Sequence, residues 1–152
     1  MLPDTSERVP LHTAEEVNRR IAAATESRLR WYAENPGLIP ERLRALDQEW
    51  DVERTLEANA AALAFAGTVA GAALDRRWLA LPALVTAFLF QHATQGWCPP
   101  LPVLRRLGFR TAREIEVERT ALRILRGDFE QARSAAIGGE SGADRALNVA
   151  RG

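Results

Sequence analysis

The amino-acid sequence predicts an all-α protein in which a two-span transmembrane helical hairpin is flanked by cytoplasmic amphipathic helices. Two charge-free stretches support this prediction, residues 58–74 and 78–104, with 17 and 27 residues. Only Asp75, Arg76 and Arg77 separate them. Because 26% of the chain is charged, charge-free segments of this length indicate helices that lie in lipid or in a deeply buried core.

Composition limits the class of protein. A length of 152 residues predicts one domain with tails, and a net charge of zero gives no field to recruit nucleic acid. The single cysteine, Cys98, excludes an internal disulfide framework and a multi-cysteine zinc site. Residues 1–30 carry no continuous apolar run, so no cleavable signal is expected and the hairpin itself would direct insertion.

The N-terminal part, residues 1–39, is predicted to be a loose lead followed by a cytoplasmic helix. The capping box Thr13–Glu16 predicts the start of that helix, which should run to about residue 33. Pro40 suits the first turn of the next element. From there the sequence permits either one long helix to Leu74 or a bend near residues 47–51.

The hairpin region, residues 40–108, is predicted to end at a proline-rich corner. The second span begins at Trp78, and Gly96 with the prolines of residues 98–102 ends it. A short helix at residues 103–107 should follow, closed by Gly108.

The C-terminal part begins with a second capping box, Thr111–Glu114, which predicts an amphipathic helix within residues 109–137. Residues 138–152 are rich in glycine and serine, a composition typical of a disordered tail.

The second span matches the thickness of a bilayer. Trp78 and Trp97 lie 19 residues apart, which corresponds to roughly 28 Å of helix. Tryptophan at both ends is the aromatic-belt pattern, so Trp78 and Trp97, together with Arg105 and Arg106, are predicted membrane-interface anchors. Arginine also favours the cytoplasmic side. Two arginines lie in the loop between the spans, and seven flank the spans on the other side, so both termini are expected in the cytoplasm. The seven flanking residues are Arg42, Arg44, Arg54, Arg105, Arg106, Arg110 and Arg113.

The first span is rich in alanine and is therefore expected to need a partner. Gly67 and Gly71 form a Gly-xxx-Gly motif, which Ala60 and Ala64 extend into a row of small residues. Such a row lets two helices approach closely in lipid, so the sequence predicts a homo-oligomer, most simply a dimer. The alternative is a soluble helical bundle with these segments as its core.

The residues around the spans resemble the YgaP-like two-helix transmembrane domain family of bacterial inner membranes. Four features carry the resemblance over residues 52–108: Glu53-Arg54 before the first span, the glycine-bearing span, Gly96-Trp97-Cys98-Pro99 after the second, and residues 104–108, Leu-Arg-Arg-Leu-Gly. The resemblance implies a self-associating membrane hairpin. In some bacterial proteins this domain follows a rhodanese module, which this sequence lacks.

Few residues suggest chemistry. Cys98 is the one candidate nucleophile, and His92 lies six residues before it, on a different face if the helix continues. With His12 as the only other histidine, the sequence predicts no metal site and no cofactor. The acidic residues among positions 47–57 are expected to form the solvated side of an amphipathic helix.

The sequence therefore predicts a non-enzymatic inner-membrane protein whose first partner is the bilayer. The leading hypothesis is a self-associating anchor or adaptor that presents its helices to an unidentified cytoplasmic protein. One alternative is a membrane-bound thiol accessory in sulfur or redox handling that uses Cys98, and another is a soluble helical interaction module.

Overall fold

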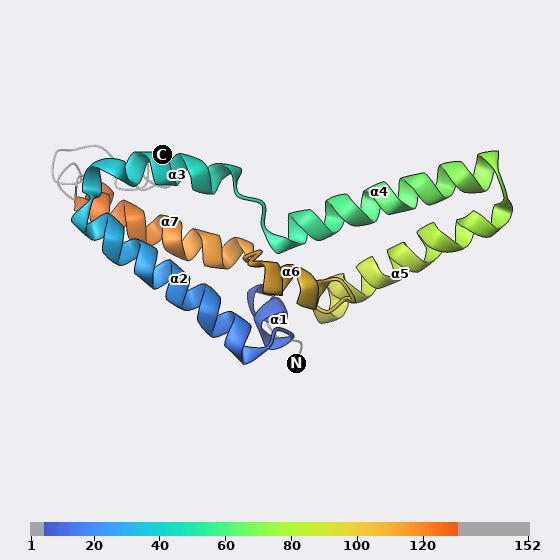
Figure 1. Cartoon of the computed structure of the whole chain (residues 1–152), viewed down its shortest axis with the longest axis horizontal. Coiled ribbons are helices and arrows are strands. Elements are labelled where there is room, and N and C mark those ends of the chain that lie inside the picture. The colour runs from blue at the N-terminus through green and yellow to red at the C-terminus, as the bar shows by residue number, and fades with distance from the viewer. Residues whose placement is uncertain (1–4, 131–152) are drawn as a thin grey trace, which may run out of the picture. The chain divides into compact units, whose positions relative to one another are not determined.

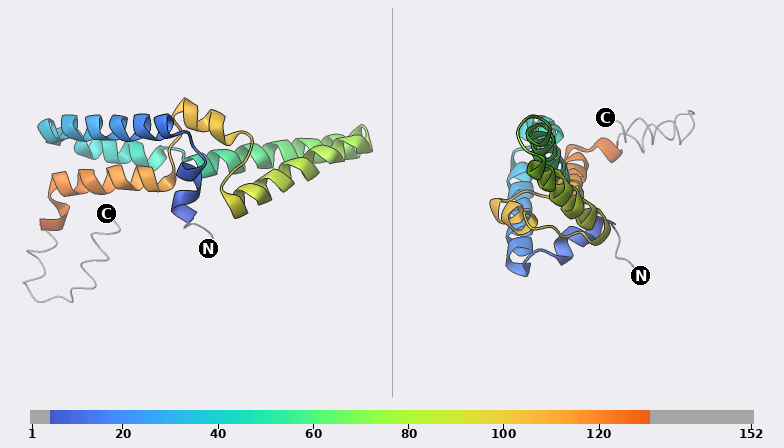
Figure 2. Two further views of the ribbon diagram at one scale, coloured as in Figure 1. Left: turned by 90° about the horizontal axis from the view of Figure 1, so that it is seen from below. Right: turned by 90° about the vertical axis from the view of Figure 1, so that its right-hand side faces the viewer.

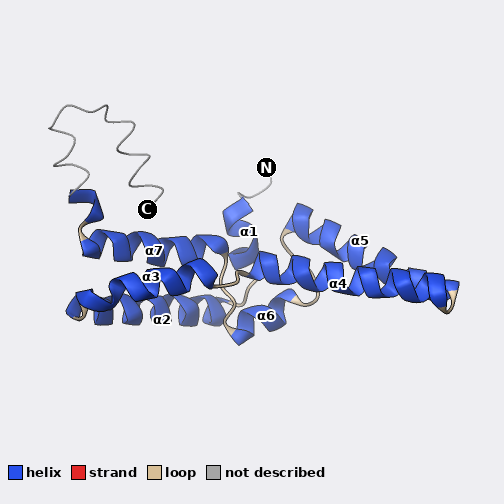
Figure 3. Cartoon of the chain, turned by 90° about the horizontal axis from the view of Figure 1, so that it is seen from above, coloured by secondary structure: helices blue, strands red, loops and turns tan. Residues whose placement is uncertain are grey.

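The computed structural model describes residues 5–130, and its regular structure there is entirely helical (Figures 1 and 3). The chain forms two compact units. The hairpin unit comprises residues 5–23 and 50–115, and the three-helix unit comprises residues 24–49 and 116–130. The elements in chain order are α1 Thr5–Leu11, α2 Glu15–Glu34, the 3₁₀ helix η1 Pro36–Leu38, α3 Ile39–Gln48, α4 Val52–Ala73, the 3₁₀ helix η2 Arg76–Leu79, α5 Ala80–Gln95, α6 Leu101–Leu107 and α7 Ala112–Arg126.

The N-terminal lead is helical where the sequence analysis expects a loose segment. In α1, the apolar side chain of Val9 is buried among Val52, Leu56 and Leu101, and this burial holds the segment in place. Helix α2 begins two residues after Thr13. The Thr13 hydroxyl instead donates to the Val9 carbonyl at 2.7 Å, which corrects the prediction that it caps α2.

The helix is interrupted between α3 and α4, so residues 41–74 do not form one long helix, which was the first of the two possibilities. Helix α3 ends at Gln48, and Glu49 adopts an extended backbone conformation. The Asp51 carboxylate then accepts a hydrogen bond from the Arg54 amide at 2.6 Å and caps α4. Asp51 is therefore a helix cap. This corrects the expectation that it belongs to the solvated face of one continuous helix.

Helices α4 and α5 form an antiparallel pair whose arms run side by side (Figures 1 and 2). Gly67 and Gly71 are buried at their contact. A Cβ atom on Gly67 would lie 2.6 Å from Cδ of Pro82, and one on Gly71 would lie 2.5 Å from Cδ2 of Leu79. Both glycines therefore pack against the second arm of the same chain. The sequence analysis instead expects them to contact a second copy of the protein.

The turns around the second arm follow the predicted pattern. Helix α5 begins at Ala80, after η2, and ends at Gly96, whose left-handed backbone (φ 77°) stops the helix. Helix α6 begins at Leu101, two residues earlier than expected, and ends at Gly108 (φ 96°). Both glycine stops are confirmed.

Among the described residues, one segment, residues 36–73, which includes the break before α4, is long and apolar enough to cross a membrane by length and composition. Only 17% of its apolar window is buried. Helix α5 contains 16 residues and none of them is buried.

Arg105 joins the segments at the base of the hairpin unit. Its side chain is fully buried and donates from all three nitrogens. It forms a bidentate pair with Glu114, at 2.7 and 2.8 Å. The remaining hydrogen bonds reach the Thr13 hydroxyl at 3.2 Å, the Asn18 side chain at 2.9 Å and the Phe109 carbonyl at 3.0 Å. One guanidinium therefore ties α6 to the start of α2 and to the start of α7.

Glu114 also completes the second capping box, which is confirmed. It accepts from the Thr111 amide at 2.8 Å, and its own amide donates to the Thr111 hydroxyl at 3.2 Å. Partial burial raises the pKa of Glu114, but the hydrogen bonds from Arg105 and Thr111 outweigh burial, and the net pKa is lowered. Glu114 therefore stays ionised, and its pair with Arg105 stays intact, below the usual pH range of glutamate titration.

The three-helix unit is organised around a second buried charge. The Glu118 carboxylate is fully buried and accepts from Arg28 at 2.8 Å and from Arg42 at 2.8 Å. Leu46, Ile39 and Leu122 are buried in the same unit and supply its apolar contacts. These two ion pairs join three helices, because Arg28 lies in α2, Arg42 in α3 and Glu118 in α7.

Helix α7 ends earlier than predicted. Gly127 has a left-handed backbone (φ 89°) directly after Arg126, and a left-handed residue stops an α-helix. Residues 128–130 are helical again, and the rest of the predicted helix, residues 131–137, and the predicted tail at residues 138–152 lie outside the described residues.

We expect Arg105→Leu to lower the free energy of unfolding by about 3–5 kcal/mol, because it leaves the buried side of Glu114 without its partner. Arg106→Leu is the matched control, since Arg106 is exposed on the same helix. Chemical denaturation followed by circular dichroism measures both variants. Equal losses in the two would contradict the role assigned to Arg105.

We expect Gly67→Ile to separate the two arms, because the new Cβ would lie 2.6 Å from Cδ of Pro82. Overpacking of this kind costs about 1–3 kcal/mol. Ala66→Ile, on an exposed neighbouring position of α4, is the control. Cysteines introduced into both arms would report their separation through the yield of a cross-linked hairpin, and an unchanged yield for Gly67→Ile would show that the contact is not close.

Candidate functional site

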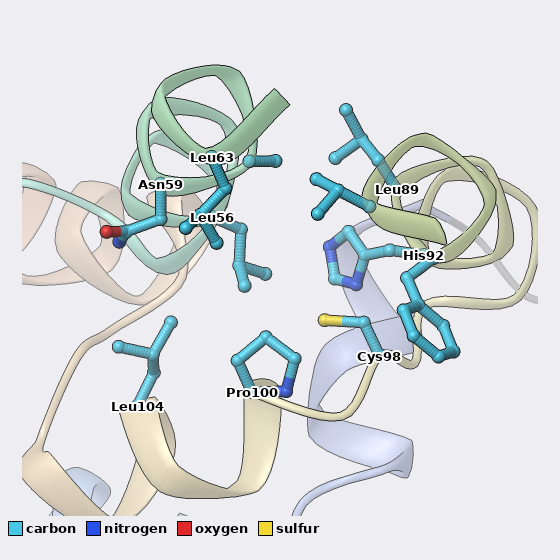
Figure 4. A pocket seen from close by; sticks show the side chains of 11 residues that line it. Leu56, Asn59, Leu63, Leu89, His92, Cys98, Pro100 and Leu104 are labelled. Carbon is cyan, nitrogen blue, oxygen red and sulfur yellow. The ribbon is translucent and has the colours of Figure 1, made fainter. Parts of the chain in front are cut away.

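A cavity of about 350 Å³ lies within the hairpin unit, between the two arms and α6 (Figure 4). Its size falls within the range of small-molecule sites, and its wall is mostly apolar with a few polar groups. The lining residues are Leu56, Asn59, Ala60, Leu63, Val85, Phe88, Leu89, His92, Cys98, Pro100 and Leu104.

The reversal of the chain at Gly96 places Cys98 in this cavity. The left-handed glycine ends α5, and the next residues return toward α4 before α6 begins. Cys98 is 4% exposed and packs with Val9, Val52 and Leu101 in the apolar core, while its sulfur points toward the cavity (Figure 4). His92 and Cys98, which a continuous helix would put on different faces, therefore line the same space.

His92 also lines a second cavity of about 490 Å³, which is bounded by residues of α1, α4 and α5. This second cavity is more polar, and its residues are Arg8, Val9, Glu53, Glu57, Leu89, His92, Ala93 and Gly96. The Nδ1 atom of His92 and the Oε2 atom of Glu53 are both buried with no hydrogen-bond partner among the described residues. A buried polar atom without a hydrogen-bond partner destabilises the folded protein, because its loss of hydration is not compensated. Leu89 and His92 thus line both cavities.

The thiol of Cys98 is held in its protonated form. Burial raises the pKa of Cys98, and the hydrogen bond from the Leu101 amide offsets this effect only in part. Since the thiolate is the nucleophile, this environment gives a slowly reacting cysteine.

The residues of the predicted small-residue row share one face of α4. Ala60 lines the apolar cavity of about 350 Å³, and Ala64 is half-buried. Gly67 and Gly71 contact the second arm. The row therefore divides into two parts. Near the loop it allows close packing, and near the open end of the hairpin it borders the cavity.

The predicted interface anchors differ in their surroundings. Trp78 is half exposed at η2, Trp97 packs against the apolar core, and Arg106 is exposed. Arg105 is fully buried and fully hydrogen-bonded, which corrects its assignment as an anchor for lipid headgroups. Sequence reasoning missed this because the motif Leu-Arg-Arg-Leu does not distinguish the inward arginine from the outward one.

Within residues 5–130, no group of three or more histidine, cysteine, aspartate or glutamate side chains is arranged to hold a metal ion. Comparison of the chain with protein-family models, curated proteins and solved structures gave no match. The site is therefore interpreted from its own residues.

We expect Cys98 to react with maleimide more slowly than an exposed cysteine at neutral pH, because it is buried and its pKa is raised. The control is Val103→Cys in a Cys98→Ser background, since Val103 is exposed on the adjacent helix. The rate for Cys98 should continue to rise with pH after the rate for the control has levelled off. A faster reaction at Cys98 than at the control would show an activated thiol.

Proposed function

We propose that this chain is a small integral inner-membrane protein in which α4 and α5 insert as a hairpin and anchor the charged helices in the cytoplasm. The observation that carries the proposal is the apolar surface that the hairpin leaves uncovered. Soluble proteins seldom leave large contiguous apolar patches exposed to water. A bilayer would bury that surface without further protein.

The uncovered side chains lie on both arms. Phe65 on α4 and Leu74 directly after it are 73% and 78% exposed, and Leu84 and Phe90 on α5 are 55% and 71% exposed. The core helix of a soluble protein with the same composition would be mostly buried, whereas the apolar window of α4 is 17% buried. These values favour the membrane hairpin over the soluble interaction module.

The lengths of both arms support two spans. Helix α4 has 22 residues, which corresponds to about 33 Å, close to the hydrocarbon thickness of a bilayer. Helix α5 has 16 residues, or about 24 Å, and is short by itself. The 4 residues of η2 add about 8 Å, because a 3₁₀ helix rises about 2.0 Å per residue. The second arm, residues 76–95, thus reaches about the same length as the first.

Self-association is a further part of the proposal. Gly67 and Gly71 already contact the second arm, so a dimer in the membrane would use the outward face of α4, where Phe65 and Val69 are exposed. The YgaP-like resemblance supports self-association, as does the lack of any cover over this face among the described residues.

A thiol accessory in sulfur or redox handling is the second candidate. The observation in its favour is that His92 and Cys98 line one cavity. The raised pKa of Cys98 weighs against it, because a sulfur acceptor works as a thiolate. We therefore place the anchor first.

We expect the protein to stay in the membrane pellet after alkaline carbonate extraction, and Leu84→Arg to impair that retention. An arginine at the centre of a span costs about 2.5–3.5 kcal/mol on the insertion scale. Leu84 is 55% exposed, so the same substitution would be well tolerated if this surface faced water. The variant therefore separates the two environments.

The matched control is Ala45→Arg, at an exposed position of α3 in the three-helix unit, which should leave retention unchanged. Recovery of the wild-type protein in the soluble fraction, monodisperse without detergent, would overturn the proposed function.

A further inference from the structure

We propose that the apolar cavity binds a single-chain neutral lipid with a hydroxyl-bearing head, of the monoacylglycerol class, with its chain between α4 and α5 and its hydroxyl at His92. This inference rests on the proposed membrane hairpin and identifies a ligand for the cavity within it.

The shape of the cavity suits one hydrocarbon chain. Along the arms, the cavity extends from Leu63 and Val85, near the middle of α4 and α5, to Cys98 and Leu104 beside α6. A molecule in it would therefore extend from mid-hairpin to the open end of the arms. In a bilayer this is the direction of an acyl chain, whose head lies at the surface.

The polar end suits a hydroxyl group. His92 lines the cavity, and one of its ring nitrogens points into the space (Figure 4). A hydroxyl both donates and accepts, so it can bond to this ring nitrogen in either tautomer of the ring.

The lining of the apolar cavity favours a neutral head over a carboxylate. No aspartate, glutamate or arginine is among the described residues that line it. A fatty-acid carboxylate would therefore be a buried charge without a paired arginine, and a neutral head avoids that cost.

Protection of Cys98 from maleimide measures occupancy, because its sulfur faces the cavity. The full chain is reconstituted in phosphatidylglycerol–phosphatidylethanolamine vesicles, and monoolein, methyl oleate or oleate is added. We expect monoolein to slow labelling, by about tenfold at nine times its half-saturating mole fraction, since only empty protein reacts. Methyl oleate, which has the chain without the hydroxyl, and oleate should protect at higher mole fractions.

Two variants test the two ends of the site. Ala60→Phe fills the cavity and should abolish protection by monoolein, whereas Ala61→Phe, at the adjacent exposed position, should preserve it. His92→Leu removes the polar end and should bring the half-saturating values for monoolein and methyl oleate together.

A further control detects changes in the bilayer as a whole. A Val69→Cys, Cys98→Ser variant carries its thiol on the exposed face of α4, and its labelling should not respond to monoolein. Equal slowing at this position, no protection of Cys98, or equal or better protection by methyl oleate or oleate would each overturn the inference. Carbonate extraction judges the anchor separately, so a correctly inserted protein without protection would refute the ligand and leave the anchor standing.

Discussion

The buried guanidinium of Arg105 is the constraint on which the hairpin unit depends. Its hydrogen bonds reach the start of α2, the start of α7 and Phe109, the second residue after α6, and its charge is balanced by Glu114. Removing a charge of this kind from water is costly, and bidentate pairing with full use of the donors repays that cost. Because Glu114 also caps α7, one ion pair fixes the start of a helix and the position of α6 together. The α6 segment in turn forms the floor of the cavity.

The cavity itself follows from an uneven contact between the arms. Near the loop, Gly67 and Gly71 have no side chains, so α5 and η2 can approach α4 closely. At the open end, the arms carry Leu56, Leu89 and other larger residues, and the return of the chain through Cys98 fills only part of the space between them. Close packing at one end and large side chains at the other leave a pocket where the hairpin meets α6.

Local signals in the sequence predicted much of this fold. The glycine stops at Gly96 and Gly108, the Thr111–Glu114 capping box and the all-helical class depend on residues close in the chain, so they can be read directly. The burial of Arg105 and Glu118 could not be predicted, because their partners lie up to 90 residues away. The same limit applies to the candidate site. Cys98 and His92 were identified individually, but their shared cavity depends on the reversal at Gly96.

All 20 basic residues of the chain are arginines, and the buried contacts use properties that lysine lacks. Arg105 engages Glu114 through two nitrogens while a third bonds elsewhere, and Glu118 accepts from two separate arginines. A lysine ammonium is a point charge without the planar fork, and it could not bridge the same set of groups. Each of the two units therefore has a polar centre built from arginine and glutamate, and the small apolar cores around them are completed by a few residues such as Leu46 and Leu101. Such centres suit helices that are too short and too charged to be held by apolar burial alone.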